Sequence, residues 1–103
     1  MTISYRPATF SEVNQTSLRG DICTSYDEIV AVLGEPHYTD PDPHAKWNCE
    51  WMIMTEDGTP FTIYNWKTGG TPTEKTDWHI GGRDMNAVFA AYEVLGMETY
   101  SYE

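Results

Sequence analysis

The sequence predicts a single α+β domain, a two-layer sandwich in which two helices cover one face of an antiparallel sheet, in the order β-α-β-β-β-α. Residues 47–53 alternate apolar and polar side chains, as a strand with one buried face does. Residues 25–33 and 84–95 repeat apolar side chains at helical spacing, and each stretch is followed by glycine. Hairpin signals between the two helices favour antiparallel pairing, and 103 residues leave room for one core.

The chain divides into an arm, a domain and a tail. Residues 1–15 show no clean period, and Arg6-Pro7 disfavours regular structure, so this part is expected to be an arm or a short strand. Residues 16–96 form the domain. It starts with a short strand at 16–23, with room for a bulge at Gly20. The acidic, aromatic tail at 97–103 is either a final edge strand or a frayed end.

A capping box predicts where the first helix begins. Ser25 is followed three residues later by Glu28, so each side chain can bind a backbone N–H of the first turn. Gly34 ends this helix. The apolar stripe consists of Tyr26, Ile29, Val30 and Leu33. The next segment, 37–44, contains Pro41 and Pro43, and we expect it to be a surface loop with no strand pairing.

The central hairpin fixes which side chains face the core. Inward residues of its first strand are predicted to be Trp47, Cys49, Trp51 and Ile53. A three-residue loop, Glu56-Asp57-Gly58, with a G1 bulge would pair Ile53 with Phe61, Trp51 with Ile63 and Cys49 with Asn65 on the core face. The other face would then pair Met52 with Thr62 and Glu50 with Tyr64. A two-residue loop would shift the register by one and send Tyr64 and Trp66 inward; we favour the bulged loop because it separates the faces better.

The last third predicts a loop, a strand and the second helix. Residues 68–76 hold two glycines, a proline and four threonines, which indicates an exposed loop. Trp78–Ile80 is a short strand, Gly81-Gly82 a tight turn and Asp84 an N-cap. The helical stripe consists of Met85, Val88, Phe89, Tyr92 and Leu95.

Composition narrows the function. Six Lys and Arg against 16 Asp and Glu give a formal charge of −10, which argues against direct binding to nucleic acid or an anionic membrane. With no apolar run of ~18 residues and no leader, we expect a soluble, cytoplasmic protein. Two cysteines are too few for a disulfide framework.

No catalytic or metal motif is present in the sequence. His37 and His44 share a loop without ligand spacing, so we expect no metal and no cofactor. Nucleophilic catalysis could draw only on Cys49, His79 and Asp77, so we expect a non-enzymatic protein, with a small hydrolase as the third choice.

The binding candidates cluster between residues 64 and 83. In the bulged register, Tyr64 and Trp66 lie on the face away from the helices, and His79 joins them. Lys67 and Arg83 make this area less acidic. The Gly81 and Gly82 amides, with Arg83, could hold an anion at a helix N-terminus. The alternative is that the arm, or the tail with Tyr100 and Tyr102, covers this patch; a symmetric contact through it would make a homodimer.

Four segments carry a resemblance: Thr-Ser-Leu-Arg-Gly-Asp-Ile at 16–22, Thr-Ser-Tyr-Asp-Glu-Ile-Val-Ala-Val-Leu-Gly-Glu-Pro at 24–36, Thr-Ile-Tyr-Asn-Trp-Lys at 62–67 and Trp-His-Ile-Gly-Gly at 78–82. Over residues 16 to about 95 the chain resembles a family of small, mostly uncharacterised proteins encoded by bacteriophages. The family brings no catalytic residues to transfer.

The resemblance implies an accessory factor in the cytoplasm of an infected bacterium. Small acidic phage proteins of this kind bind and inhibit host machinery, as anti-CRISPR and other anti-defence proteins do. We therefore expect a protein that binds and modulates a basic or nucleic-acid-handling host protein. The alternative is a small-ligand module, such as a sponge for a nucleotide signal, using Trp66, His79, the Gly81 and Gly82 amides and Arg83.

Overall fold

Across residues 3–97, the fold consists of a six-stranded antiparallel sheet and two helices. The computed structural model describes residues 3–97 of the chain. The strands run in the order β1-β4-β5-β6-β2, and β3 pairs with β4 beside β1. The elements are β1 Tyr5–Pro7, β2 Ser17–Thr24, α1 Tyr26–Leu33, β3 Tyr38–Thr39, β4 Cys49–Thr55, β5 Pro60–Tyr64, β6 Thr76–Gly82 and α2 Asn86–Val94.

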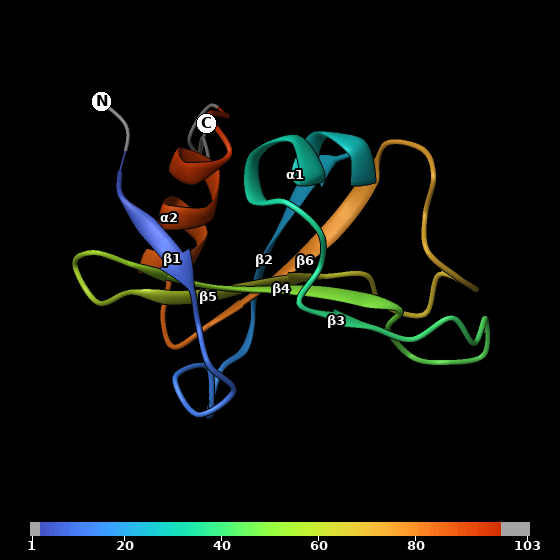
Figure 1. Ribbon diagram of the computed structural model, residues 1–103, viewed down its shortest axis with the longest axis horizontal. Helices are drawn as coiled ribbons and strands as arrows, with labels where there is room; N and C mark the ends of the chain where they lie inside the picture. Colours follow the sequence, from blue (N-terminus) through green and yellow to red (C-terminus); the bar gives the residue numbers. More distant parts are fainter. Residues whose placement is uncertain (1–2, 98–103) are drawn as a thin grey trace.

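Both helices lie on the same face of the sheet (Figure 1), which confirms the predicted α+β sandwich. The core between the layers contains Trp51 and Trp78, whose rings meet edge to face at 5.6 Å. Ile29 of α1 and Val88 of α2 belong to this same core. Each buried indole N–H donates to a backbone carbonyl, Trp51 to Gly34 at 2.8 Å and Trp78 to Thr24 at 3.1 Å. Aromatic burial thus joins both helices to one sheet face.

The hairpin between β4 and β5 has the register of the bulged loop. Ile53 lies opposite Phe61 and Glu50 opposite Tyr64. Gly58 has a φ of 88°, the left-handed conformation that this loop requires. The prediction is confirmed, and it places Tyr64 on the face away from the helices.

Two short strands extend the predicted order. The expectation that residues 37–44 pair with no strand is wrong, because Tyr38 and Thr39 pair with Glu50 and Cys49 before the first proline. The arm also contributes β1, which pairs with residues 53–55 of β4. Its Pro7 is tolerated because β1 is an edge strand.

His37 is part of this strand edge, since its N–H donates to Glu50 O of β4 at 2.9 Å. The Met52 N–H donates to His37 Nδ1 at 2.9 Å, which requires Nδ1 to be unprotonated. Burial lowers the pKa of His37, because an imidazolium there would lose hydration.

The lowered pKa of His37 leads to a prediction about how the stability of the fold depends on pH. A folded-state pKa below the unfolded value gives stability that is present above the unfolded pKa and lost as the pH falls through the folded pKa. Between about pH 7.5 and pH 5, we expect the free energy of unfolding to fall less in His37→Asn, whose amide oxygen can accept without titrating, than in the unchanged protein. Urea unfolding at several pH values measures this. His44→Asn is the control, since that imidazole is 93% exposed; equal slopes for all three proteins would contradict the assignment.

The glycine pair is used differently from the prediction. Gly81 and Gly82 are not a turn; they end β6 and pair on one side with β5 and on the other with β2. Neither has a positive φ, so their lack of a side chain provides space rather than unusual backbone angles. The register shift between Leu18 and Gly20 confirms the bulge in the first strand.

The caps and buried faces predicted for the two helices agree with the structure to different degrees. At α1 the predicted capping box is present, with Glu28 N donating to the Ser25 hydroxyl at 3.2 Å. At α2 the predicted N-cap is one residue early, since Met85 occupies that position, although the Asp84 carboxylate still accepts from Asn86 N at 2.9 Å. The predicted stripe is also partly wrong, because Met85 is exposed. The buried residues of α2 are Ala87, Val88, Ala90, Ala91 and Val94.

The arm covers one end of the open sheet face. Ala8 and Val13 pack against Met52, with Met54 beside them. Figure 1 shows this loop after β1 on the opposite side of the sheet from the helices. The arm therefore crosses this face from β1 at one border of the sheet toward β2 at the other and packs on Met52 of β4 on its way, while Tyr100 and Tyr102 lie outside the described residues.

Candidate functional site

A row of polar and aromatic side chains crosses the open face of the sheet. Cross-strand pairing places Tyr38 opposite Glu50, Glu50 opposite Tyr64, Tyr64 opposite His79, and His79 opposite Asp21. Directly opposite residues on one face lie close enough to contact. The Tyr64 and His79 rings meet edge to face at 5.4 Å, and His79 Nε2 lies 3.9 Å from Asp21 Oδ1.

Two tryptophans stand at the end of this row. Trp47 and Trp66 are stacked, with ring centroids 5.9 Å apart and planes 11° from parallel, and they are 36% and 38% exposed. Trp66 also stacks on His79 at 6.5 Å and meets Tyr64 edge to face at 6.3 Å. The prediction that Trp47 points into the core is wrong. β4 begins only at Cys49, so the strand alternation does not extend back to Trp47.

A buried pair of asparagines holds the two tryptophans in place. Asn48 follows Trp47 and Asn65 precedes Trp66, and the Asn65 amide donates to Asn48 Oδ1 at 2.9 Å. Asn65 Oδ1 accepts from Asn48 N at 2.7 Å and from Cys49 N at 3.1 Å. Every buried polar atom here has a partner, so the network fixes the backbone on both sides of the stack.

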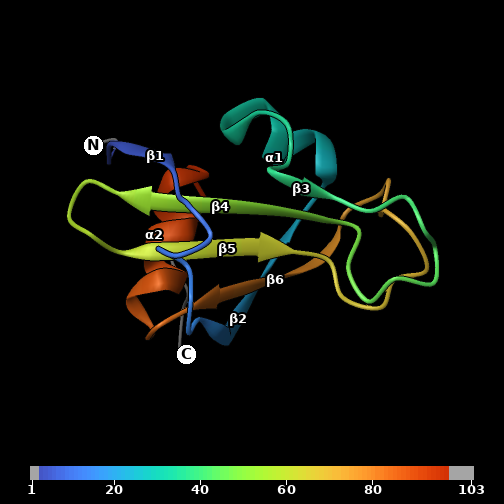
Figure 2. The same cartoon turned by 60° about the horizontal axis from the view of Figure 1, so that its bottom comes forward.

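The same pair also anchors two loops. Asn48 Nδ2 donates to the carbonyl oxygens of Asp40 and Asp42 at 2.9 and 2.8 Å, and Asn65 Nδ2 donates to the Thr68 hydroxyl at 2.8 Å. The loops before β4 and after β5 run beside each other beyond the end of the sheet (Figure 2). The predicted loop at 68–76 is confirmed for residues 68–75, and its base is tied to the tryptophans.

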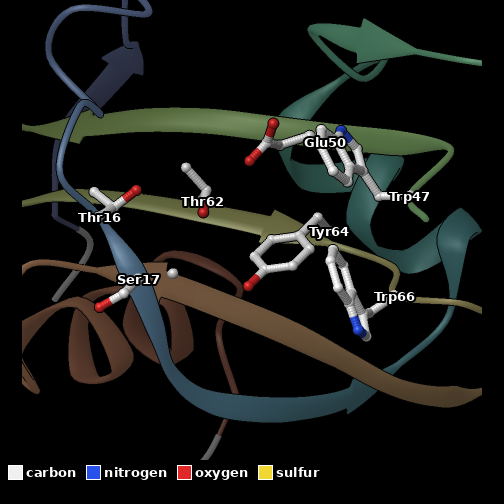
Figure 3. Close-up of a pocket in the computed structure, with 8 residues that line it drawn as sticks. Thr16, Ser17, Trp47, Glu50, Thr62, Tyr64 and Trp66 are labelled. Carbon is white, nitrogen blue, oxygen red and sulfur yellow. The ribbon is translucent and has the colours of Figure 1, made fainter.

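A hollow of about 210 Å³, which we call the aromatic groove, lies on this face. In Figure 3 the two indoles stand at one end, and the Glu50 carboxylate and Tyr64 hydroxyl point toward the other end, at Thr16 and Ser17. The groove is lined by Thr16, Ser17, Trp47, Glu50, Thr62, Tyr64, Trp66 and Gly81. It thus has an aromatic end and a polar, acidic end.

Glu50 is an unusual feature of the groove. Its carboxylate is partly buried and makes no hydrogen bond or ion pair with any residue between 3 and 97. Burial raises the pKa of Glu50, because the ionised form loses hydration. Burial also raises the pKa of Tyr64, and the negative charges of Glu50 and Asp21 raise it further. The groove therefore contains a carboxyl group that no residue between 3 and 97 pairs with.

One of the protein's own cations already contacts the aromatic end. Lys67 Nζ lies 5.7 Å from the centroid of the Trp66 ring, within cation–π range. Lys67 has a φ of 54°, a conformation that non-glycine residues seldom adopt, and its N–H donates to Lys46 O at 2.6 Å. The tight loop after Trp66 turns the ammonium back over the indole.

The structure brings some of the predicted binding residues together and separates others. Tyr64, Trp66, Lys67 and His79 are neighbours, and Gly81 lines the groove. Gly82 instead approaches the opposite helix layer, since a Cβ there would lie 2.1 Å from the Cβ of Ala87. The Arg83 guanidinium donates to Glu12 O at 2.9 Å. The predicted grouping of two glycine amides and Arg83 at a helix N-terminus is not formed, because both glycines belong to β6.

The candidate nucleophile lies in the core. Cys49 is 1% exposed, and burial raises the pKa of its thiol to about 11, so the thiolate is disfavoured. The carboxylate near His79 is that of Asp21, not the expected Asp77. Cys49 points to the core face, whereas His79 lies on the open face.

Residues 3–97 contain neither a cluster of metal-binding side chains nor a membrane-spanning helix. In that range no three His, Cys, Asp or Glu side chains gather in a way that could hold a metal ion. Neither helix is long and apolar enough to span a bilayer.

More than half of the residues that line the groove were not predicted from the sequence as site residues. Glu50 was available from the predicted register, which already placed it opposite Tyr64 on the open face. Thr16 and Ser17, where the domain and β2 begin, had no such signal, although Thr9 and Glu12 form a capping box that indicates an ordered turn before them. Arg6 forms a two-bonded ion pair with Glu12, which lowers the pKa of Glu12 to about 2 and ties the arm back on itself.

Comparisons of the chain with models of protein families, with curated proteins and with solved structures found no match.

Proposed function

We propose that this protein is a non-enzymatic binding protein that uses the aromatic groove to engage a basic partner protein. The observation that carries the proposal is the exposed stack of Trp47 and Trp66 beside an unpaired carboxylate, on a sheet face that the helices leave open. Exposed tryptophans that surround a shallow hollow are typical anchors of protein interfaces. Because the Asn48–Asn65 pair orders both rings before binding, little side-chain entropy remains to be lost.

The charge of the chain supports a basic partner. A formal charge of −10 on 103 residues attracts a positively charged protein over a distance and repels nucleic acid. The resemblance to small phage-encoded proteins favours a host protein as that partner, and inhibition of host defence as the outcome. Both the partner and this outcome are parts of the proposal.

The alternative of a nucleotide-binding module has lost its main support. It depended on free backbone N–H groups of Gly81 and Gly82 at the start of a helix. Those residues lie in a strand with paired neighbours on both sides, and Arg83 is bound to the arm. An acidic groove also disfavours phosphate.

Replacing Trp66 with alanine should abolish partner capture without unfolding the protein. Exposed interface tryptophans commonly contribute about 2 kcal/mol or more to binding, which corresponds to a loss of at least ~30-fold in affinity. The measurement is capture from bacterial lysate by the immobilised protein at two salt concentrations, followed by titration of the captured protein with the purified variant. Higher salt should weaken the binding of the unchanged protein.

Met85→Ala is the matched control. Met85 is 39% exposed, a fraction similar to that of Trp66, but it lies before α2 and does not line the groove. Its loss should leave capture unchanged. If Trp66→Ala and Met85→Ala capture the same proteins with equal strength, the groove is not the binding surface.

A further inference from the structure

The aromatic groove has the size and the chemistry of a receptor for one side chain. At about 210 Å³ it is smaller than the ~300–1,000 Å³ typical of sites for drug-sized ligands. Its aromatic end offers flat rings for an apolar or delocalised stem, and its other end offers the Glu50 carboxylate and the hydroxyl groups of Thr16, Ser17, Thr62 and Tyr64. A matching ligand is elongated, apolar or planar along its length, and positively charged at its tip.

The negative charge of Glu50 selects among such ligands. A partly buried carboxylate with no partner in residues 3–97 lacks compensation for its lost hydration, and an incoming cation would supply it. Electrostatic attraction is stronger here than on an open surface, because the neighbouring rings exclude water. Neutral ligands of the same shape would leave this carboxylate unpaired.

We propose that the aromatic groove binds an arginine side chain of the partner protein, with the guanidinium paired to Glu50 and stacked against Trp47, Trp66 or Tyr64. Arginine fits better than lysine because its planar group both stacks on aromatic rings and donates two parallel hydrogen bonds to a carboxylate. The hydroxyls of Thr16, Ser17 and Thr62 can accept its remaining N–H groups. This inference rests on the proposed function and specifies what that surface recognises.

Lys67 supports the assignment from within the protein. Its ammonium already lies near the Trp66 ring, so this ring accepts a cation in the absence of any partner. An arginine entering the groove would meet that positive charge. Removing this charge in Lys67→Gln should therefore strengthen the binding of arginine. The affinity for a ligand that is not cationic should stay unchanged.

The test compares peptides whose central side chains differ in charge and in hydrogen-bond donors at the tip. Acetyl-Gly-Arg-Gly-amide is titrated against the ¹⁵N-labelled protein, followed by its citrulline counterpart, which has nearly the same shape but no charge. The four indole N–H signals are the readout, because Trp47 and Trp66 line the groove while Trp51 and Trp78 are buried and hydrogen-bonded. We expect two signals to move and two to stay, with citrulline binding weaker by on the order of tenfold. The peptide with lysine should bind with intermediate strength.

Two variants with the same change in net charge separate local from global electrostatics. Glu50→Gln should weaken arginine binding on the order of tenfold and leave citrulline binding unchanged. Glu56→Gln, in the hairpin loop outside the groove, should change neither. Glu50→Gln should fold, because glutamine keeps the shape of the side chain and the Glu50 carboxylate makes no hydrogen bond or ion pair within residues 3–97 that would be lost.

The outcomes distinguish this inference from the proposed function. Equal shifts with arginine and citrulline peptides, or arginine binding that survives Glu50→Gln, would overturn the arginine assignment while the groove remains a binding surface. Lysine binding tighter than arginine would overturn the preference for a guanidinium. A partner protein that is captured through Trp66 but binds Glu50→Gln equally well would likewise reject the arginine site and keep the proposed function.

Discussion

Asn65→Ala should lower the free energy of unfolding by about 3 kcal/mol, because it leaves two buried backbone N–H groups without an acceptor at roughly 1–3 kcal/mol each. Those groups belong to Asn48 and Cys49 and donate to Asn65 Oδ1. Domains of this size are stable by only ~5–15 kcal/mol, so this is a large fraction of the total. Urea unfolding followed by circular dichroism measures the change. The NMR signals of the Trp47 and Trp66 indoles should also broaden or move in the folded fraction, since the backbone next to each tryptophan loses its anchor.

Asn86→Ala is the control for this substitution. Asn86 is exposed at the start of α2, and its side chain makes no hydrogen bond within residues 3–97. Exposed substitutions of this kind usually change stability by no more than about 0.5 kcal/mol. A loss below 1 kcal/mol in Asn65→Ala would mean that the asparagine pair does not hold the two loop bases as we infer.

Gly82→Ala should be at least as damaging, with an expected loss of about 3 kcal/mol or more. A Cβ at this position would lie 2.1 Å from the Cβ of Ala87, whereas carbon atoms in contact need ~3.5–4.0 Å. Ala87 is fixed to the helix backbone, so relief requires α2 to move away from the sheet. Thermal and urea unfolding should both show the loss, and α2 amides should exchange faster with solvent.

The neighbouring glycine provides the matched comparison. At Gly81 the added Cβ would meet the Thr62 hydroxyl oxygen at 2.5 Å, and this side chain can rotate. We expect Gly81→Ala to cost about 1 kcal/mol and to fill the floor of the aromatic groove, so peptide binding falls while the fold persists. If Gly81→Ala proved the more destabilising of the two, the close approach of α2 to β6 would not be the tight contact that we describe.

These glycines show why the sequence predicted the layers but not their spacing. Gly-Gly between a strand and a helix is typical of a turn, and only the paired strands reveal that the residues extend β6. The same close approach explains α2. Because Gly82 approaches Ala87 and Gly20 approaches Val88, these two residues rather than Met85 fill the contact between α2 and the sheet. Periodicity finds an apolar helix face but does not measure how near the sheet will come.

The candidate site was predictable where it depended on register and unpredictable where it depended on side-chain hydrogen bonds. Gly58 fixed the hairpin loop, and the loop alone placed Tyr64 and Glu50 together on the open face. Trp47 was assigned to the wrong face because alternation was extended through Asn48. The Asn48 side chain donates to the loop carbonyls of Asp40 and Asp42 instead, and β4 starts at the next residue, Cys49. Two-residue β3 is too short to produce any period.

The outer strands of the sheet bear on how the chain behaves at high concentration. Exposed strand edges recruit other chains and seed aggregation. One border of this sheet consists of β1 and β3, which are three and two residues long, and β1 includes Pro7. At the other border, β2 is interrupted by its bulge and carries Arg19 and Asp21. Within residues 3–97 neither border offers a long, flat template, and we therefore expect the protein to display its two tryptophans without polymerising through its own sheet.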